Sequence, residues 1–220
     1  MDIGASFSYM FQDENWLKKI LIGGVVGFIP ILNFAALGYV IQVIRNVRDG
    51  QALPLPEWDR FGQYFVDGLW LFLILLVWFI PLILVACLQG IGAAIVGENQ
   101  DAAQAYGIVS ACFGCLIALW ALIVAAVSPA IMVRYAEVGQ FMAGFQFSEI
   151  LGVISANVGA YIIAVLLTWV AGLIASLGVI LCVVGVIFTQ FWSYLVIGNL
   201  FGQLAAQQRS AGGSELMTTG

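Results

Sequence analysis

Residues 158–206 read VGAYIIAVLLTWVAGLIASLGVILCVVGVIFTQFWSYLVIGNLFGQLAA. The stretch holds no Asp, Glu, Lys or Arg and is apolar over almost its whole length. A helix that crosses a membrane needs about 20 apolar residues, so this stretch is long enough for two. We therefore expect residues 159–206 to form a hairpin of two spans, turning near Ser176–Gly178 or, as an alternative, at Cys182–Gly185.

The composition of the whole chain agrees with that expectation. Hydrophobic residues make up 63% and charged residues 9%, and the mean hydropathy is +1.06. A typical soluble domain is about 45–50% apolar and about 25% charged. So few charges could not cover this much apolar surface in water, which predicts an integral membrane protein. Met1 and Asp2 do not open a basic leader, so we expect the first apolar segment to be retained.

Three further apolar segments precede the hairpin: Leu17–Ile44, Leu69–Val96 and Ile108–Val133. Lone strands leave backbone groups unsatisfied in lipid, whereas helices do not. The predicted fold class is therefore all-α: a polytopic integral membrane protein with four full transmembrane helices, a first apolar segment that is re-entrant or a fifth span, and interfacial amphipathic helices. The expected parts are an interfacial amphipathic helix (1–16), a re-entrant hairpin or first span (17–44), a cytoplasmic loop and surface helix (45–68), two spans with an acidic external loop at 97–107 (69–133), a cytoplasmic surface helix (134–158), the hairpin of two spans (159–206) and a polar tail (207–220).

Apolar residues at helical spacing predict the three surface helices. Their apolar faces contain Ile3, Phe7, Met10 and Phe11; Phe61, Phe65 and Leu69; and Phe147, Ile150, Leu151, Ile154 and Val158. Such spacing is typical of a helix that lies in the headgroup region of a membrane. A helix that precedes a span and packs on neighbouring protein has the same pattern.

The seven basic residues predict the orientation of the chain. The loop 97–107 has none of them and carries Glu98 and Asp101, so the positive-inside rule puts that loop outside. The basic residues are Lys18, Lys19, Arg45, Arg48, Arg60, Arg134 and Arg209. If residues 17–44 bend at Pro30 and return, all seven face the cytoplasm; if they cross once, Lys18 and Lys19 lie outside. Asn33 could satisfy the backbone groups that a bend at Pro30 frees.

The N-terminal third also resembles a known family. The segments that carry the likeness are Phe11–Trp16, Lys18–Gly24, Ile29–Asn33, Leu37–Tyr39, Arg45-Asn46, Pro56–Asp59 and Phe65–Gly68. A weaker similarity is present at Cys182–Gly185 and Gln190-Phe191. In order and spacing they resemble a prokaryotic membrane family catalogued as a domain of unknown function, number 4013, most clearly over residues 1–70. The chain departs from it at Trp70, where a basic residue is often found. The resemblance implies bacterial or archaeal origin and several spans, and it implies no activity.

Candidate chemistry in the sequence is sparse. Cys112 and Cys115 form a lone C-x-x-C inside an apolar segment of a chain without histidine, so we interpret them as packing residues and expect no metal and no cofactor. Glu57, Asp59 and Asp67 are interpreted as a solvated helix face and caps, not as paired catalytic carboxylates. We expect no enzyme activity. The net charge of −5 and the lack of a basic patch argue against nucleic acid.

Polar residues in the last predicted span are the main functional candidates. Polar groups in a membrane must face protein or water, so these residues either pack helices together or line a path. The candidates are Gln190, Ser193, Tyr194, Gly198, Asn199, Gly202 and Gln203. The glycines at 198 and 202, like those at 23 and 27, favour close helix packing. Arg134, which can pair with Glu137, is a candidate contact for a lipid headgroup or a gate.

Together these observations predict a non-catalytic integral membrane protein of the bacterial or archaeal cytoplasmic membrane. It would be an auxiliary or scaffolding subunit of a membrane complex, or an organiser of membrane structure. Its expected partners are the lipid bilayer and other membrane subunits or further copies of itself. A small transporter or channel for an ion or neutral solute is the alternative, suggested by the polar last span and by a faint duplication of residues 58–133 in 147–206.

Overall fold

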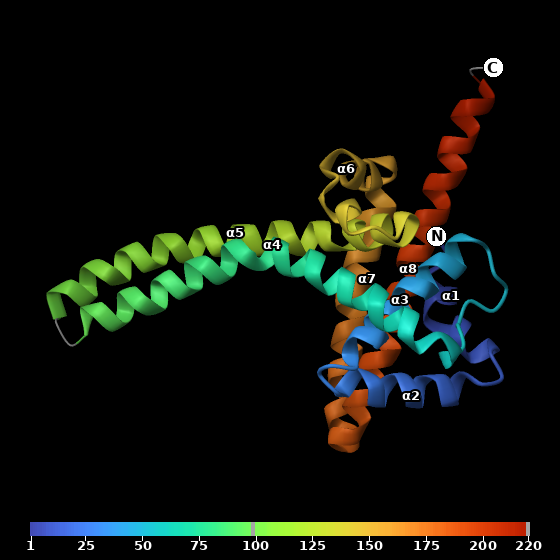
Figure 1. Cartoon of the computed structure of the whole chain (residues 1–220), viewed down its shortest axis with the longest axis horizontal. Coiled ribbons are helices and arrows are strands. Elements are labelled where there is room, and N and C mark those ends of the chain that lie inside the picture. The colour runs from blue at the N-terminus through green and yellow to red at the C-terminus, as the bar shows by residue number, and fades with distance from the viewer. Residues whose placement is uncertain (98–99, 219–220) are drawn as a thin grey trace. The chain divides into compact units, whose positions relative to one another are not determined.

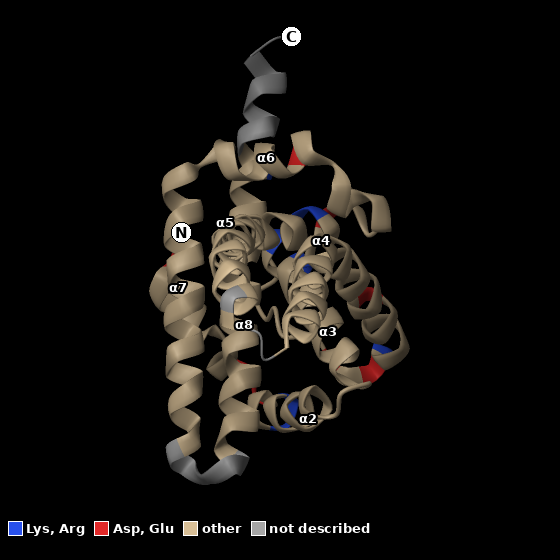
Figure 2. Cartoon of the chain, turned by 90° about the vertical axis from the view of Figure 1, so that its left-hand side faces the viewer, with Lys and Arg blue, Asp and Glu red and all other residues tan. Residues whose placement is uncertain are grey.

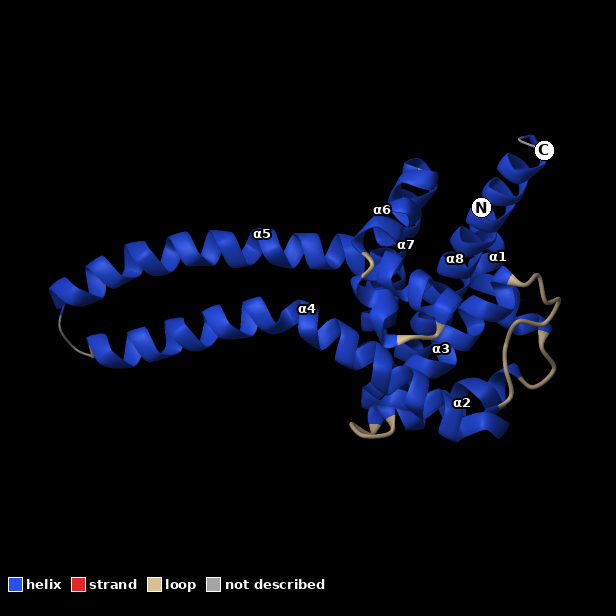
Figure 3. Cartoon of the chain, turned by 45° about the horizontal axis from the view of Figure 1, so that its top comes forward, coloured by secondary structure: helices blue, strands red, loops and turns tan. Residues whose placement is uncertain are grey.

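The computed structural model describes residues 1–97 and 100–218, with side chains described outside 101, 180–184 and 211–218. Within that part the chain is helical, and no strand occurs (Figures 1 and 3). The elements are α1 (Ile3–Ser8), η1 (Tyr9–Gln12), α2 (Trp16–Phe28), α3 (Asn33–Arg48), η2 (Trp58–Arg60), α4 (Phe61–Val96), α5 (Gln100–Val138), η3 (Phe141–Phe145), α6 (Phe147–Ala156), α7 (Val158–Ser176), η4 (Leu177–Leu181) and α8 (Cys182–Thr218).

Three segments are long and apolar enough to cross a membrane: Trp58–Val96, Ala102–Val138 and Val158–Val179. They contain α4, α5 and α7. These segments support the prediction of a helical membrane protein. The predicted count of four or five spans is not confirmed. The fourth predicted span falls in α8, which starts with residues whose side chains are not described. The predicted turn at Ser176–Gly178 coincides with the end of α7 and the start of η4.

The first apolar segment consists of two helices, α2 and α3, separated at Ile29–Leu32. A residue before proline is pushed out of the helical region, and Ile29 indeed ends α2 with φ −83° and ψ 117°. The Asn33 amide donates a hydrogen bond to the Gly27 carbonyl at 2.8 Å. This confirms the predicted role of Asn33, because that carbonyl belongs to the helix turn that the break interrupts.

The chain divides into two compact units, and unit 1 comprises Met1–Leu73 and Pro129–Gly220. Helix α8 is its axis: α1, α2, α3, α6 and α7 all pack on it. Apolar and aromatic side chains fill the centre, with Tyr39, Phe191 and Leu200 inaccessible or nearly so. Tyr39 stacks on Trp58 at a ring-centroid distance of 4.4 Å, which fixes the start of the α4 segment against α3. In Figure 1, α7 runs beside α8.

Helices α3 and α4 touch backbone to backbone within unit 1. A Cβ atom on Gly68 would lie 2.7 Å from the Gly38 nitrogen, and one on Gly38 would lie 2.6 Å from the Tyr64 carbonyl carbon. Real Cβ atoms essentially never approach other atoms closer than 3.0 Å. Two glycines are therefore required at this crossing.

Unit 2 is Ile74–Ser128, which comprises the C-terminal part of α4 and the N-terminal part of α5 packed against each other. Trp78 stacks on Trp120 at 6.3 Å, and the Trp120 indole N–H donates to the Trp78 carbonyl at 3.1 Å. The Tyr106 hydroxyl donates to the Gln89 carbonyl, and the ring of Tyr106 occupies the space left by Gly92. These contacts hold two helices whose other side chains are mostly exposed and apolar.

The structure also changes some predicted boundaries and faces. Helix α4 runs without a break from Phe61, so the second predicted surface helix and the span after it are one helix. Helix α5 begins at Gln100, so most of the predicted loop 97–107 is helical, as its alanines favour. The predicted apolar face of the first surface helix is split: Met10 is buried and Phe7 packs on Trp192, whereas Ile3 is 42% exposed and Phe11 is 51% exposed. Ser6 is fully buried.

Candidate functional site

The candidate residues of α8 lie on two sides of the helix, and the first set contacts α3 and α1. At Gly202 a Cβ would lie 3.0 Å from the Ile44 carbonyl oxygen, and at Gly198 it would lie 3.0 Å from a methyl group of Val43. These two glycines therefore let α3 approach the α8 backbone. Of the pair predicted in α2, Gly23 behaves alike, because a Cβ there would overlap the ring of Phe191, whereas Gly27 has only an ordinary contact of 3.7 Å with the Ala36 Cβ.

Asn199 and Gln203 bind α1 through a polar cluster. The Ser6 hydroxyl donates to Asn199 Oδ1 at 2.9 Å, and the Gln203 amide donates to the same oxygen at 2.7 Å. The backbone N–H of Asp2 donates to Gln203 Oε1 at 2.7 Å. Ser6 and Asn199 are buried, and Ser193 donates within α8 to the Gln190 carbonyl. We call Ser6, Asn199 and Gln203 the α1–α8 polar cluster.

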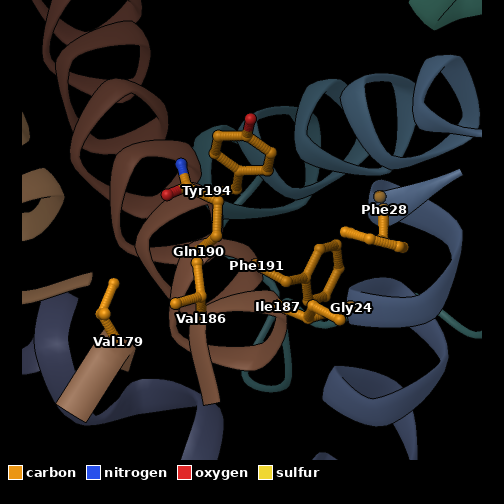
Figure 4. A pocket seen from close by; sticks show the side chains of 9 residues that line it. Gly24, Phe28, Val179, Val186, Ile187, Gln190, Phe191 and Tyr194 are labelled. Carbon is orange, nitrogen blue, oxygen red and sulfur yellow. The ribbon is translucent and has the colours of Figure 1, made fainter. Parts of the chain in front are cut away.

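Gln190 and Tyr194 belong to the second set and line a groove between α2 and α8 (Figure 4). The groove has a volume of about 290 Å³, and its other walls are apolar, including Phe28, Ile187 and Phe191. Gln190 is exposed and Tyr194 partly exposed. These two residues are thus the ones that could meet a ligand, while the others of the predicted set contact protein.

Arg134 lies near the C-terminal end of α5 beside a larger cavity of about 930 Å³. Its guanidinium donates to Gln146 Oε1 at 3.1 and 3.0 Å and to Glu137 at 3.2 Å, and it lies 3.6 Å from Glu149. Arg48 and Arg209 also line the cavity. Three arginines therefore face the same space as two glutamates. We call these five residues, Arg48, Arg134, Glu137, Glu149 and Arg209, the charged cradle.

Asp49 adds a second contact beside the charged cradle. It accepts hydrogen bonds from Arg48 at 2.9 Å and from Arg209 at 3.0 Å, which joins the end of α3 to α8. The hydrogen bond from Arg48 is the main cause that lowers the pKa of the Asp49 carboxyl from its ordinary value. The carboxylate therefore stays charged to a lower pH than that of an ordinary aspartate.

Sequence reasoning missed a buried lysine. Lys19 is almost inaccessible, and its ammonium lies 2.6 Å from Asp13 and 2.7 Å from Glu57 while donating to the Leu55 carbonyl. The Trp58 indole donates to the Lys19 carbonyl at 3.1 Å. The sequence offered one signal: Asp13 and Lys19 flank the start of α2, where opposite charges can meet.

Asp59 and Asp67 were both interpreted as part of a solvated helix face, and the structure contradicts this for Asp67 but agrees with it for Asp59. Asp67 does not lie on a solvated face: its carboxylate pairs with Arg45 at 2.6 Å, and both side chains are less than a fifth exposed. Asp59 is 68% exposed, as a solvated face requires. Figure 2 shows the basic residues of α2 and α3 and the acidic residue of α6, while α7 has no charged residue.

Cys112 and Cys115 are both exposed on α5, and the side chain of Cys182 lies outside the described residues. Among the residues that the structure describes, no group of three or more Cys, Asp or Glu side chains could hold a metal ion. The predicted absence of metal and cofactor remains a prediction.

A family model described as "Protein of unknown function (DUF4013)" matches residues 22–184. The chain belongs to this family. The match confirms the predicted family and extends well past residue 70, although the Phe11–Trp16 segment precedes it. The DUF4013 match takes in α3 to α7 and so includes Arg134 but not the α8 candidates after residue 184. No curated protein and no solved structure matches the chain.

Proposed function

We propose that the chain is a non-catalytic integral membrane protein of a bacterial or archaeal cytoplasmic membrane, acting as an auxiliary or scaffolding subunit or as an organiser of membrane structure. The observation that carries this proposal is the engagement of the α8 polar residues. Asn199 and Gln203 bond to α1, and Gly198 and Gly202 admit α3. Asn199 and Gln203, which could have lined a path for a solute, thus bond to a neighbouring helix instead.

The contacts of Lys19 support a re-entrant first segment. If residues 17–44 crossed the membrane once, Lys19 near their start and Glu57 after their end would lie on opposite sides of a hydrocarbon layer about 30 Å thick. The two side chains are instead 2.7 Å apart. In this proposal α2 and α3 enter from the cytoplasmic side and return to it, and the amphipathic helices lie on that side.

The distribution of charge supports the same orientation. All seven Lys and Arg residues belong to unit 1, and unit 2 contains only the acidic residues Glu98 and Asp101. A hairpin tip without basic residues is typical of an external loop. The basic residues of unit 1 would then face the cytoplasm.

Unit 2 is the proposed surface for partners. In the most apolar 18-residue stretch of the α4 segment, only 17% is buried within the chain. In the corresponding stretch of the α5 segment, 6% is buried. Leu116 and Leu122 are 61% and 60% exposed. Such a hairpin offers an apolar side surface to lipid or to the helices of another subunit.

Photo-crosslinking tests this proposal. A benzoylphenylalanine placed at Leu116 or at Leu122 in the full chain should, on illumination of intact membranes, give an adduct of defined mass with one protein. The same group at Leu166 of α7, which is 59% exposed, serves as the matched control in unit 1. A chain that forms only lipid adducts at every position, and that purifies alone in mild detergent, would overturn the subunit role.

The groove between α2 and α8 favours the second candidate, a transporter or channel. Gln190 and Tyr194 are polar side chains in an otherwise apolar groove, which is how a site for a neutral solute is often built. The purified chain in liposomes should then move a solute, and Gln190→Leu should abolish that movement without lowering thermal stability. Absence of flux for a panel of ions and neutral solutes would remove this candidate.

A further inference from the structure

The charged cradle has the composition of a site for a zwitterion. It is lined by three arginines and two glutamates around a space of about 930 Å³. An anion alone would meet two carboxylates, and a cation alone would meet three guanidinium groups. A molecule that carries a phosphate and an ammonium a few bonds apart can satisfy both.

The side chains of the charged cradle have capacity left for a ligand. A guanidinium has five N–H donors. Two bonds from Arg134 end on the single oxygen of Gln146, and the third goes to Glu137. Arg209 is 71% exposed and Glu149 is 56% exposed, so both can turn toward a bound group.

The surroundings of the charged cradle favour a lipid over a solute in water. Arg134 lies near the end of one of the span-capable segments, Ala102–Val138. Helix α6, which supplies Glu149, buries Ile150 and Val153 but leaves Leu151 60% exposed. Met142 in the preceding η3 is 63% exposed. Apolar side chains exposed beside a charged site are typical of a helix at the level between headgroups and acyl chains.

We infer that the charged cradle binds the headgroup of a phospholipid that carries a primary ammonium, with the phosphate on Arg134 and Arg209 and the ammonium at Glu149. The inference goes beyond the proposed function, because such binding suits a subunit and a transporter equally. It needs only that α5 cross the membrane.

Lipid binding by the delipidated full chain in detergent tests the inference, with native mass spectrometry as the readout. Three lipids with identical acyl chains are compared: phosphatidylethanolamine, phosphatidylcholine and phosphatidylglycerol. We expect retention of phosphatidylethanolamine to exceed the other two roughly tenfold, since only its ammonium has N–H donors for a carboxylate. Equal retention of all three would overturn the inference.

Two variants separate the proposed contacts. Arg209→Gln should weaken the binding of all three lipids, and Glu149→Gln should remove the preference for phosphatidylethanolamine over phosphatidylglycerol. The matched controls are Arg60→Gln and Asp59→Asn, the same charge changes at exposed residues outside the cradle. A Glu149→Gln protein that keeps the preference would contradict the assignment. Displacement of the lipid by water-soluble phosphoethanolamine at equal concentration would overturn the lipid as the occupant.

Discussion

The glycine crossing between α3 and α4 permits a quantitative test of the packing within unit 1. In Gly38→Ala the added Cβ would stand 2.6 Å from the Tyr64 carbonyl carbon and 2.8 Å from its Cα. Both atoms belong to the backbone of a helix, so no side chain can turn aside. The two helices must move apart.

The size of the effect follows from the distances. Ordinary contact begins near 3.4 Å, and the Tyr64 carbonyl oxygen lies nearer to the added Cβ than either carbon. The helices must therefore separate by more than about 0.8 Å, which forfeits at least a quarter to a half of the dispersion attraction across the crossing. Overpacking costs about 1–3 kcal/mol, and the upper part of that range, about 2–3 kcal/mol, applies here because backbone meets backbone; the better helix propensity of alanine returns about 1 kcal/mol. We therefore expect Gly38→Ala to lower the free energy of unfolding by about 1–2 kcal/mol.

Thermal unfolding in a mild detergent, followed by tryptophan fluorescence, is the appropriate assay. One kcal/mol shifts the midpoint of a protein of this size by roughly 2–4 °C, so a decrease of roughly 2–8 °C is expected. Gly62→Ala in α4 is the matched control, because nothing lies within 4 Å of its Cβ position. A Gly38→Ala protein that melts at or above the wild-type temperature would refute the reasoning.

Three further predictions concern buried polar contacts. Lys19→Met should cost about 3–5 kcal/mol, because Asp13 keeps a buried charge without its partner, whereas Lys18→Met at the exposed neighbouring position should leave the melting temperature unchanged. Asn199→Leu should cost about 1–3 kcal/mol, since the Ser6 hydroxyl and the Gln203 amide both lose the Asn199 oxygen as an acceptor, and chemical unfolding in detergent would measure it. Trp120→Phe should cost about 0.5–1.5 kcal/mol by removing an N–H donor, and faster amide hydrogen exchange within unit 2 would show it.

The helix content and the close contacts at the glycines could be predicted from the sequence, because both depend on the local pattern of residues. A proline after a run of helix formers ends a helix wherever it stands, which is why the break near Pro30 was predictable. Glycines at a spacing of four permit close approach irrespective of the partner, and Gly198 and Gly202 do lie against α3.

Partners across long sequence distances were not predictable. Lys19 was interpreted as a topological signal because the pattern around it does not reveal Glu57 as a partner. Asp67 repeats at helical spacing with Asp59 and so looked solvated, yet Arg45 on another helix reaches it. The burial of Ser6 in α1 was missed for the same reason, because its partners Asn199 and Gln203 lie on α8.

The α1–α8 polar cluster also has a consequence for the order in which the protein can mature. Ser6 is translated well before its acceptor Asn199, which lies 193 positions later. Helices α2 and α3 likewise pack on α8, which follows them in the chain. Contacts between such distant residues form late and slowly. The helices that precede α8 must therefore wait in the membrane, with the Ser6 hydroxyl unpaired by Asn199, until α8 has been translated.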